Sequence, residues 1–405
     1  MLDDFGQRIR DIILSEMDLS RELSDEEICD LIGSVVSREA RDRPMTIKDR
    51  AELERTIFNS LRKLDVLQEL VDDRDVTEIM VNGPNDIFYE KAGRIQRFKG
   101  HFSSEEKLED VIQQIVGRHN RVVNQASPIV DTRLSDGSRV NIVLNPISIG
   151  GSAVSIRKFP EHPMSMERLV EIEALSPEVA RLLQILTQAK YNIFISGGTG
   201  SGKTTFLNAL SQYIPDDERI ITIEDSAELQ LLGAKNIVRL ETRNANNDGV
   251  TPITIRDLIR TALRMRPDRI IVGECRGAEA LDMLQAMNTG HDGSLSTGHA
   301  NSPHDIISRI ETMVLQGQDF PLNAIRQQIA SGIDIIVQLG RLRDKSRRAL
   351  EISEVDGFMD GEIVLHTLYH FEETAVLDSG RIQGFLKKAG TLCHTDKLMA
   401  AGLSV

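Results

Sequence analysis

The sequence predicts an α/β protein whose larger, C-terminal part is a mostly parallel sheet covered by helices. Two observations lead to this fold class. From residue 176 onward, apolar runs rich in Ile and Val alternate with helical patterns. One of these runs also leads through a glycine-rich turn directly into a helix. The periodicity changes twice before that point, so we expect a helical region over 1–72, an α+β domain over 73–160, a linker over 161–175 and the α/β domain over 176–405.

The glycine-rich turn lies within Asn192–Thr205 and matches the strand–GxxxxGK[ST]–helix pattern of a phosphate-binding loop. Glycines let successive backbone N–H groups surround phosphate oxygens, and the helix N-terminus adds partial positive charge. Lys203 is expected to reach the β- and γ-phosphates and Thr204 to bind the metal, so ATP and Mg²⁺ are the expected ligands. The residues expected to contact the nucleotide are Gly198, Thr199, Gly200, Ser201, Gly202, Lys203, Thr204 and Thr205.

The composition is that of a soluble cytoplasmic protein. Of 405 residues, 40% are hydrophobic and 27% charged, no apolar run approaches the roughly 18 residues of a membrane helix, and the first residues are acidic rather than basic. Cys29, Cys275 and Cys393 are widely spaced and fit a reducing compartment. A net charge of −14 and 4% aromatic residues without Trp argue against a general nucleic-acid binder.

The first two regions differ in their hydrophobic period. Over 1–72 the apolar residues follow helical spacing, which favours a small bundle used for packing or docking. Over 73–160 short strands separated by Gly, Pro and Asn turns surround one helix that Ser104 caps. The expected strands are 77–81, 87–89, 94–96, 139–144 and 153–157.

Acidic residues follow two strands of the α/β domain. The expected strands there are 192–196, 219–224, 236–240, 269–273, 294–297 and 333–339. Ligands of such sheets bind beyond the carboxyl ends of the strands. Glu274 is therefore the candidate that polarises the attacking water, and Glu224 and Glu228 are candidates for the metal shell. Gly273 stands where many P-loop enzymes have Asp, so the metal is also compatible with Thr204 and waters alone.

Two further sets of residues have open interpretations. Arg256, Arg260 and Arg264 recur every four residues, so they repel one another in a helix unless an anion lies nearby. The anion could be a neighbouring subunit, the acidic strand ends or phosphate, and a solvated basic face is about as plausible. His299, and with less support His291, could sense the γ-phosphate, since no third ligand completes a zinc site.

Four segments together resemble the type II/IV secretion ATPase superfamily. They are 197–205, 223–228, 264–274 and the segment around His299, and 283–293 resembles the CpaF/TadA branch, the motors of Tad/Flp pilus assembly. The resemblance implies Walker A, Asp box, Walker B and His box segments, and a RecA-like ATPase domain preceded by a small PAS-like α+β domain.

The same resemblance implies a homo-hexamer in the cytoplasm, peripheral at the inner face of the membrane, that docks on an inner-membrane platform protein without inserting into the bilayer. It also implies that Arg139 and Arg157, and less securely Arg133, approach the phosphates from the α+β domain. Cys275 replaces an aliphatic residue of many relatives and is read as a small buried hydrophobe. The alternatives are a DNA-transfer motor, a small-molecule kinase and a non-catalytic scaffold.

Overall fold

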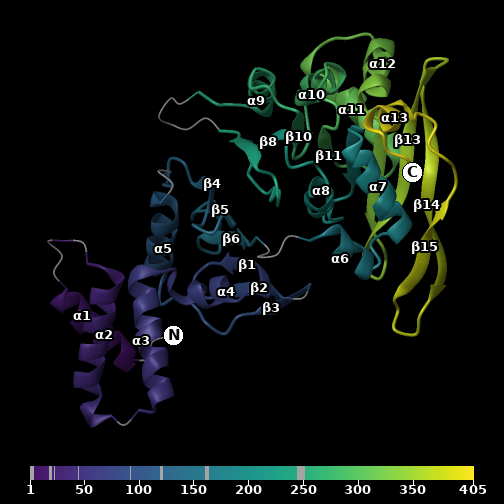
Figure 1. Cartoon of the computed structure of the whole chain (residues 1–405). Helices are drawn as coiled ribbons and strands as arrows, with labels where there is room; N and C mark the ends of the chain where they lie inside the picture. Colours follow the sequence, from purple (N-terminus) through teal and green to yellow (C-terminus); the bar gives the residue numbers. More distant parts are fainter. Residues whose placement is uncertain are drawn as a thin grey trace. The chain divides into compact units, whose positions relative to one another are not determined.

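The computed structural model divides the chain into two compact units, Met1–Glu161 and His162–Val405, which we describe separately. The structure describes residues 4–17, 21, 23–43, 45–91, 93–118, 122–159, 164–243 and 251–405. Figure 1 shows both units coloured along the sequence. No helix within these described ranges is long and apolar enough to cross a membrane.

The first unit begins with the expected helices. α1 (Asp4–Glu16), α2 (Asp25–Glu39) and α3 (Ile47–Arg62) bury one apolar stripe each in a shared core, and a short α4 (Gln68–Asp72) follows. Capping boxes at Ser24 and Thr46 begin α2 and α3, because each side chain accepts a backbone N–H that has no partner within the helix. The core residues of this bundle are Ile9, Ile13, Ile28, Ile32, Val35, Val36 and Ile57.

An antiparallel sheet follows, with strand order β3-β2-β1-β6-β5-β4. Its strands are β1 (Val76–Asn82), β2 (Ile87–Lys91), β3 (Arg94–Arg97), β4 (Ile129–Arg133), β5 (Arg139–Val143) and β6 (Ala153–Arg157). α5 (Glu105–Gly117) packs its predicted apolar face on this sheet. β4 was not expected from the sequence, because this edge strand alternates apolar and polar residues over only five positions. Leu64, Leu67 and Leu70 also belong to this core, so the helical region and the sheet share it.

The second unit contains a sheet of order β15-β14-β13-β12-β7-β11-β10-β8-β9. The strands from β12 to β9 in this order are parallel, as expected. They are β7 (Ile193–Gly197), β8 (Arg219–Glu224), β9 (Asn236–Glu241), β10 (Arg269–Val272), β11 (Leu295–Gly298) and β12 (Ile335–Arg341). β7, with the glycine-rich turn at its end, lies centrally between β11 and β12.

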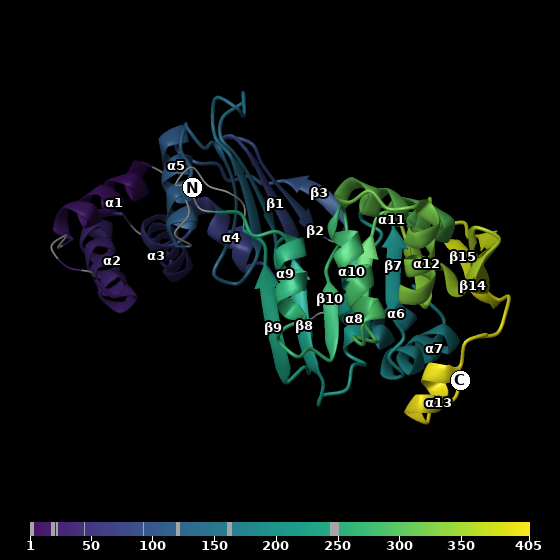
Figure 2. The same ribbon diagram turned by 90° about the horizontal axis from the view of Figure 1, so that it is seen from above.

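Helices cover both faces of the parallel strands. α7 (Pro177–Gln188) and α8 (Lys203–Ser211) share one apolar core with the sheet. α9 (Ile255–Ala262), α10 (Glu279–Asn288), α11 (Pro303–Gly317) and α12 (Leu322–Gly332) pack on the opposite face. Figure 2 shows the second group in front of the sheet. α6 (Met166–Glu171) lies within 161–175, where a linker was expected, and residues 160–163 lie outside the described residues.

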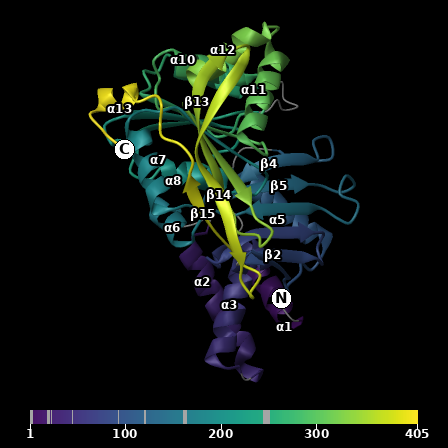
Figure 3. The ribbon, with the colours of Figure 1, turned by 90° about the vertical axis from the view of Figure 1, so that its right-hand side faces the viewer.

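Three long antiparallel strands extend this sheet at one edge. They are β13 (Arg347–Met359), β14 (Glu362–Val376) and β15 (Ile382–Lys388), and α13 (Asp396–Ala401) follows them (Figure 3). These strands were not expected from the sequence, because their apolar residues are interspersed with charged ones and show no continuous run. They matter for function because β13 begins beside the glycine-rich turn.

Candidate nucleotide-binding site

The glycine-rich turn has the backbone of a phosphate-binding loop. Gly200 and Gly202 have φ of 72° and 96°, in the left-handed region that favours glycine. A side chain at Gly197 would lie 2.5 Å from Ser201 Oγ and 2.7 Å from the carbonyl oxygen of Leu339, so only glycine fits there. α8 begins at Lys203 directly after this turn, and its free N–H groups face the carboxyl edge of the sheet.

Lys203 lies at the base of this loop with its charge nearly covered. Its Nζ donates to the carbonyl oxygens of Gly197 (3.0 Å) and Gly198 (3.1 Å) and lies 3.2 Å from Nδ1 of His299. The side chain is only 8% exposed, and burial lowers the pKa of the ammonium group. Lys203 forms no ion pair with any of the described residues, and a triphosphate on the loop would supply this anionic partner.

His299 connects Lys203 to Glu274. An ammonium group can only donate, so we assign Nδ1 of His299, the ring nitrogen nearer to Lys203, as the acceptor and place the ring proton on Nε2, which lies 2.7 Å from Oε1 of Glu274. Burial and the charge of Lys203 lower the pKa of His299, which favours this neutral tautomer. The three side chains therefore form a chain from the phosphate loop to the end of β10.

Glu274 is kept ionised by its neighbours. Burial raises its pKa, but the hydrogen bond from Arg276 and the charges of Arg276, His299 and Lys203 outweigh burial, and the net pKa is lowered. Nη2 of Arg276 donates to Oε2 of Glu274 at 2.6 Å, and Nη1 lies 3.8 Å from Asp225. An ionised carboxylate held in place at this edge can align a water molecule.

Glu224 occupies the space that Gly273 leaves open. A side chain at residue 273 would lie 2.8 Å from Cγ of Glu224, so glycine at this position leaves room for the Glu224 side chain. Oε1 of Glu224 accepts the backbone N–H groups of Glu228 and Leu229, whereas Oε2 is buried without a partner. Burial raises the pKa of this carboxyl to about 7, although the two N–H groups oppose the shift.

Two hollows flank the phosphate loop. One, of about 960 Å³ up to its open mouth, is lined by Gly198, Thr199, His299 and Arg309, among others. The other, of about 430 Å³, adjoins Ser201, Gly202 and Thr205 and is mostly apolar. Its lining residues include Met164, Leu169, Ile172, Ala174, Phe206, Leu339, Arg347 and Ala349. Arg309 and Arg347 were missed from the sequence, because neither belongs to a phosphate-binding motif.

The expected arginines of the first unit share one row of its sheet. Arg139 lies opposite Arg133 on β4 and opposite Arg157 on β6, and Arg157 lies opposite Glu78 on β1. Nε of Arg157 is 3.9 Å from Oε1 of Glu78. Adjacent like charges across strands repel, so an anion beside this row would stabilise it.

The surroundings of Arg256 and Arg260 on α9 differ from each of the alternatives expected from the sequence. Arg256 and Arg260 both bind Asp282 of α10, at 2.6 and 2.8 Å, and Asp282 is 4% exposed. The anion that relieves their repulsion is therefore in the same unit. Arg264 is exposed.

His291 does not lie near the phosphate loop, so the expectation that it senses the γ-phosphate is wrong. It precedes β11 and therefore lies at the amino end of that strand, whereas His299 follows the carboxyl end. Its Nδ1 is 3.2 Å from the carbonyl oxygen of Ala286. Cys275 is 1% exposed, as expected of a small buried hydrophobe.

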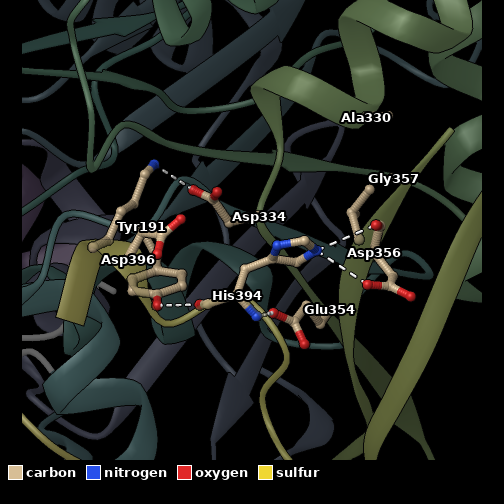
Figure 4. Close-up of a pocket in the computed structure, with 10 residues that line it drawn as sticks. Tyr191, Ala330, Asp334, Glu354, Asp356, Gly357, His394 and Asp396 are labelled. Carbon is tan, nitrogen blue, oxygen red and sulfur yellow. Dashed lines mark hydrogen bonds and ion pairs between the residues drawn. The ribbon is translucent and has the colours of Figure 1, made fainter. Parts of the chain in front are cut away.

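A separate hollow of about 640 Å³ lies at the amino edge of the parallel strands (Figure 4). Tyr191 and Asp334 precede β7 and β12, and they bind His394 and Lys397 of the C-terminal segment. Glu354 accepts the backbone N–H groups of Cys393 and His394. Because ligands of parallel sheets bind at the carboxyl edge, these contacts hold the C-terminal segment and are not the nucleotide site.

The fold and the loop define a RecA-like P-loop protein. Residues 60–383 match the type II/IV secretion system protein family, and the chain belongs to this family of ATPases. It is 32% identical over 340 residues to a putative conjugal transfer protein of Mycobacterium tuberculosis H37Rv, covering 82% of this chain and 96% of the relative. It is 33% identical over 320 residues to the type IV secretion system protein PtlH of Bordetella pertussis, covering 73% and 94%.

Solved structures agree on the fold. The pilus retraction motor PilT with bound ADP has a TM-score of 0.54 at 23% identity, covering 76% of this chain and 82% of PilT. The ATPase DotB of Legionella pneumophila has a TM-score of 0.51 at 22% identity, covering 72% and 80%. These likenesses establish the RecA-like fold.

Proposed function

We propose that this ATPase is a motor that hydrolyses Mg·ATP to power the assembly of a Tad/Flp-type pilus. The chain of contacts from Lys203 through His299 to Glu274 is the observation that carries the catalytic part of the proposal. It connects the cation that would bind the γ-phosphate to the carboxylate that would align water, within one unit and at the carboxyl edge of the sheet.

Each residue of this chain has a separate role in the proposal. Lys203 exchanges its two carbonyl partners and His299 for phosphate oxygens, so His299 loses the cation at Nδ1 when ATP binds. Glu274 stays ionised and accepts a hydrogen bond from the attacking water. Arg276 positions Glu274 and keeps it charged.

The donor set fits a magnesium ion. Mg²⁺ prefers oxygen ligands. Such oxygens belong to Thr204 on the first turn of α8, to Glu224 with its partnerless buried oxygen, and to Glu228, whose backbone N–H binds Glu224. When bound there, the ion would neutralise charge that develops on the phosphates.

We infer the orientation of the bound nucleotide from the residues that line the two hollows. The hollow beside Gly198 and His299 is polar and open and suits the γ-phosphate, whereas the apolar hollow beside Gly202 and Thr205 suits a purine base. We infer that the row of Arg133, Arg139 and Arg157 supplies cations to the phosphates from the first unit, within a ring of six subunits. Charge on the phosphates would then favour closure of one unit on the other.

The partner in this proposal is an inner-membrane platform protein, on which a cytoplasmic hexamer docks. The resemblance of 283–293 to the CpaF/TadA branch supports the pilus assignment. A conjugative DNA-transfer motor is the second candidate, because the Mycobacterium tuberculosis relative is named a putative conjugal transfer protein. The net charge of −14 disfavours direct DNA binding.

Phosphate release by the purified chain tests the catalytic part. Lys203→Ala should abolish turnover, and Lys235→Ala, which removes an exposed lysine paired with Asp216, should not. Turnover by Lys203→Ala at the wild-type rate would refute the site. Deletion of the gene in its host should remove surface pili and leave plasmid transfer intact, whereas the opposite result would favour the conjugative motor.

A further inference from the structure

The paired strands β12 and β13 extend beyond the last residue of β7, next to the phosphate loop. Leu339 of β12 lies opposite Gly197, the last residue of β7. β12 then continues through Gly340 to Arg341, and Arg347 at the start of β13 lies directly opposite Arg341. Two arginines therefore flank the loop that follows Gly197.

This arginine pair shares a face with the apolar hollow. The rungs Leu339–Ala349 and Arg341–Arg347 are two residues apart along both strands, so their side chains project from the same side. Leu339 and Ala349 line the hollow beside the phosphate loop. On this face, the two apolar residues that line the hollow are thus followed along the strands by two positively charged residues.

The two charges are uncompensated, unlike those of their neighbours. Arg343 binds Glu373, and Arg348 binds Glu173. Among the residues that the structure describes, Arg341 and Arg347 are exposed and have no ion pair. Like charges directly opposite in a ladder destabilise the sheet, and such violations of local rules are typical of functional sites.

Arg347 also reaches the loop itself. Its Cδ lies 3.6 Å from the position that a Cβ at Gly202 would occupy, and Arg347 lines the hollow together with Ser201, Gly202 and Thr205. Gly202 is the N-cap of α8, where the helix end adds partial positive charge. Arg347 and the N-terminus of α8 therefore lie together beside the loop, and Arg341 lies opposite Arg347 in the ladder.

We propose that Arg341 and Arg347 bind the nucleotide on the base side of the phosphate loop, at the phosphate nearest the ribose. This inference rests on the proposed function, because it takes the direction of the nucleotide from it. Lys203, His299 and Glu274 lie at the γ end of the site. The arginine pair instead contacts a part that ATP and ADP share, so it sets the affinity for both nucleotides equally.

Equilibrium binding of ADP and of a non-hydrolysable ATP analogue to the full-length chain tests this inference. Arg347→Ala and Arg341→Ala should each weaken both ligands about tenfold, as loss of a charge-assisted hydrogen bond does. The KM for ATP should rise by a similar factor, since the change lies in binding. Arg347→Lys should recover most of the affinity, and Arg343→Ala, the matched control, should bind like the wild type.

Thermal unfolding separates binding from a structural role. Removal of one arginine relieves the repulsion, so the ligand-free Tm of Arg347→Ala should not fall, while the rise in Tm that ADP causes should shrink. A lower ligand-free Tm with unchanged affinity would overturn the inference, and so would a loss confined to the ATP analogue. A wild-type chain that binds neither nucleotide would instead refute the proposed function and this inference with it.

Discussion

The buried carboxyl of Glu224 makes the stability of the second unit depend on pH, and Glu224→Gln should remove that dependence. The glutamine carbonyl can still accept the backbone N–H groups of Glu228 and Leu229, as Oε1 of Glu224 does. Its amide nitrogen replaces the oxygen that has no partner. That replacement lowers the free energy of unfolding by about 1–3 kcal/mol at every pH, so it does not change how this free energy depends on pH.

The size of the pH effect follows from the pKa of Glu224. Burial raises it from 4.5 to about 7, so between these values the folded chain binds a proton that the unfolded chain releases. The stabilisation is complete below the unfolded pKa and is lost as the pH rises through the folded pKa. Linkage gives a loss of roughly 2–3 kcal/mol in the free energy of unfolding between pH 5 and pH 8.

Urea titrations at pH 5, 6, 7 and 8 measure this loss. The difference in unfolding midpoint between the wild type and Glu224→Gln should change steadily in favour of the variant as the pH rises. Glu228→Gln leaves Glu224 in place but removes a nearby charge that helps to raise the pKa of Glu224, so it should weaken the wild-type dependence without abolishing it. Parallel curves for the wild type and Glu224→Gln would show that Glu224 does not titrate in this range and would refute the reasoning from burial.

Two further predictions concern catalysis. Arg157→Ala should lower turnover at least tenfold, about 1.4 kcal/mol of transition-state stabilisation, and an unchanged phosphate-release rate would mean that this arginine is structural. Arg276→Ala removes the hydrogen bond that keeps the pKa of Glu274 low, so burial then raises this pKa and turnover should fall at a higher pH than in the wild type as the solution is acidified. A pH–rate profile with the wild-type acid limb would refute that role for Arg276.

The arginines of this protein show how far a linear pattern can be interpreted. The spacing of Arg256 and Arg260 left two interpretations open, an anion nearby or a solvated basic face, and the structure shows an anion. Its identity, Asp282, lies on a different helix, and no local pattern links the two segments. The same holds for Arg341 and Arg347, whose opposition depends on the register of β12 with β13.

The two histidines show the same limit on a smaller scale. His291 and His299 flank one short strand, and from the sequence both were candidates for sensing phosphate. Strand direction separates them, because the nucleotide site lies at the carboxyl edge and His291 lies at the amino edge. A residue's chemistry can be read from its type, whereas its distance from the site cannot.

The sequence by itself determined the phosphate-binding loop, the mostly parallel α/β fold and the family. These features depend on contiguous residues: a strand, its glycines and the helix that follows are encoded within about fourteen positions. The tertiary structure alone decided that His299 joins Lys203 to Glu274, that Glu224 fills the space beside Gly273, and that three antiparallel strands complete the sheet. Strand order and register bring distant residues together, and both result from packing of the whole unit rather than from local propensity.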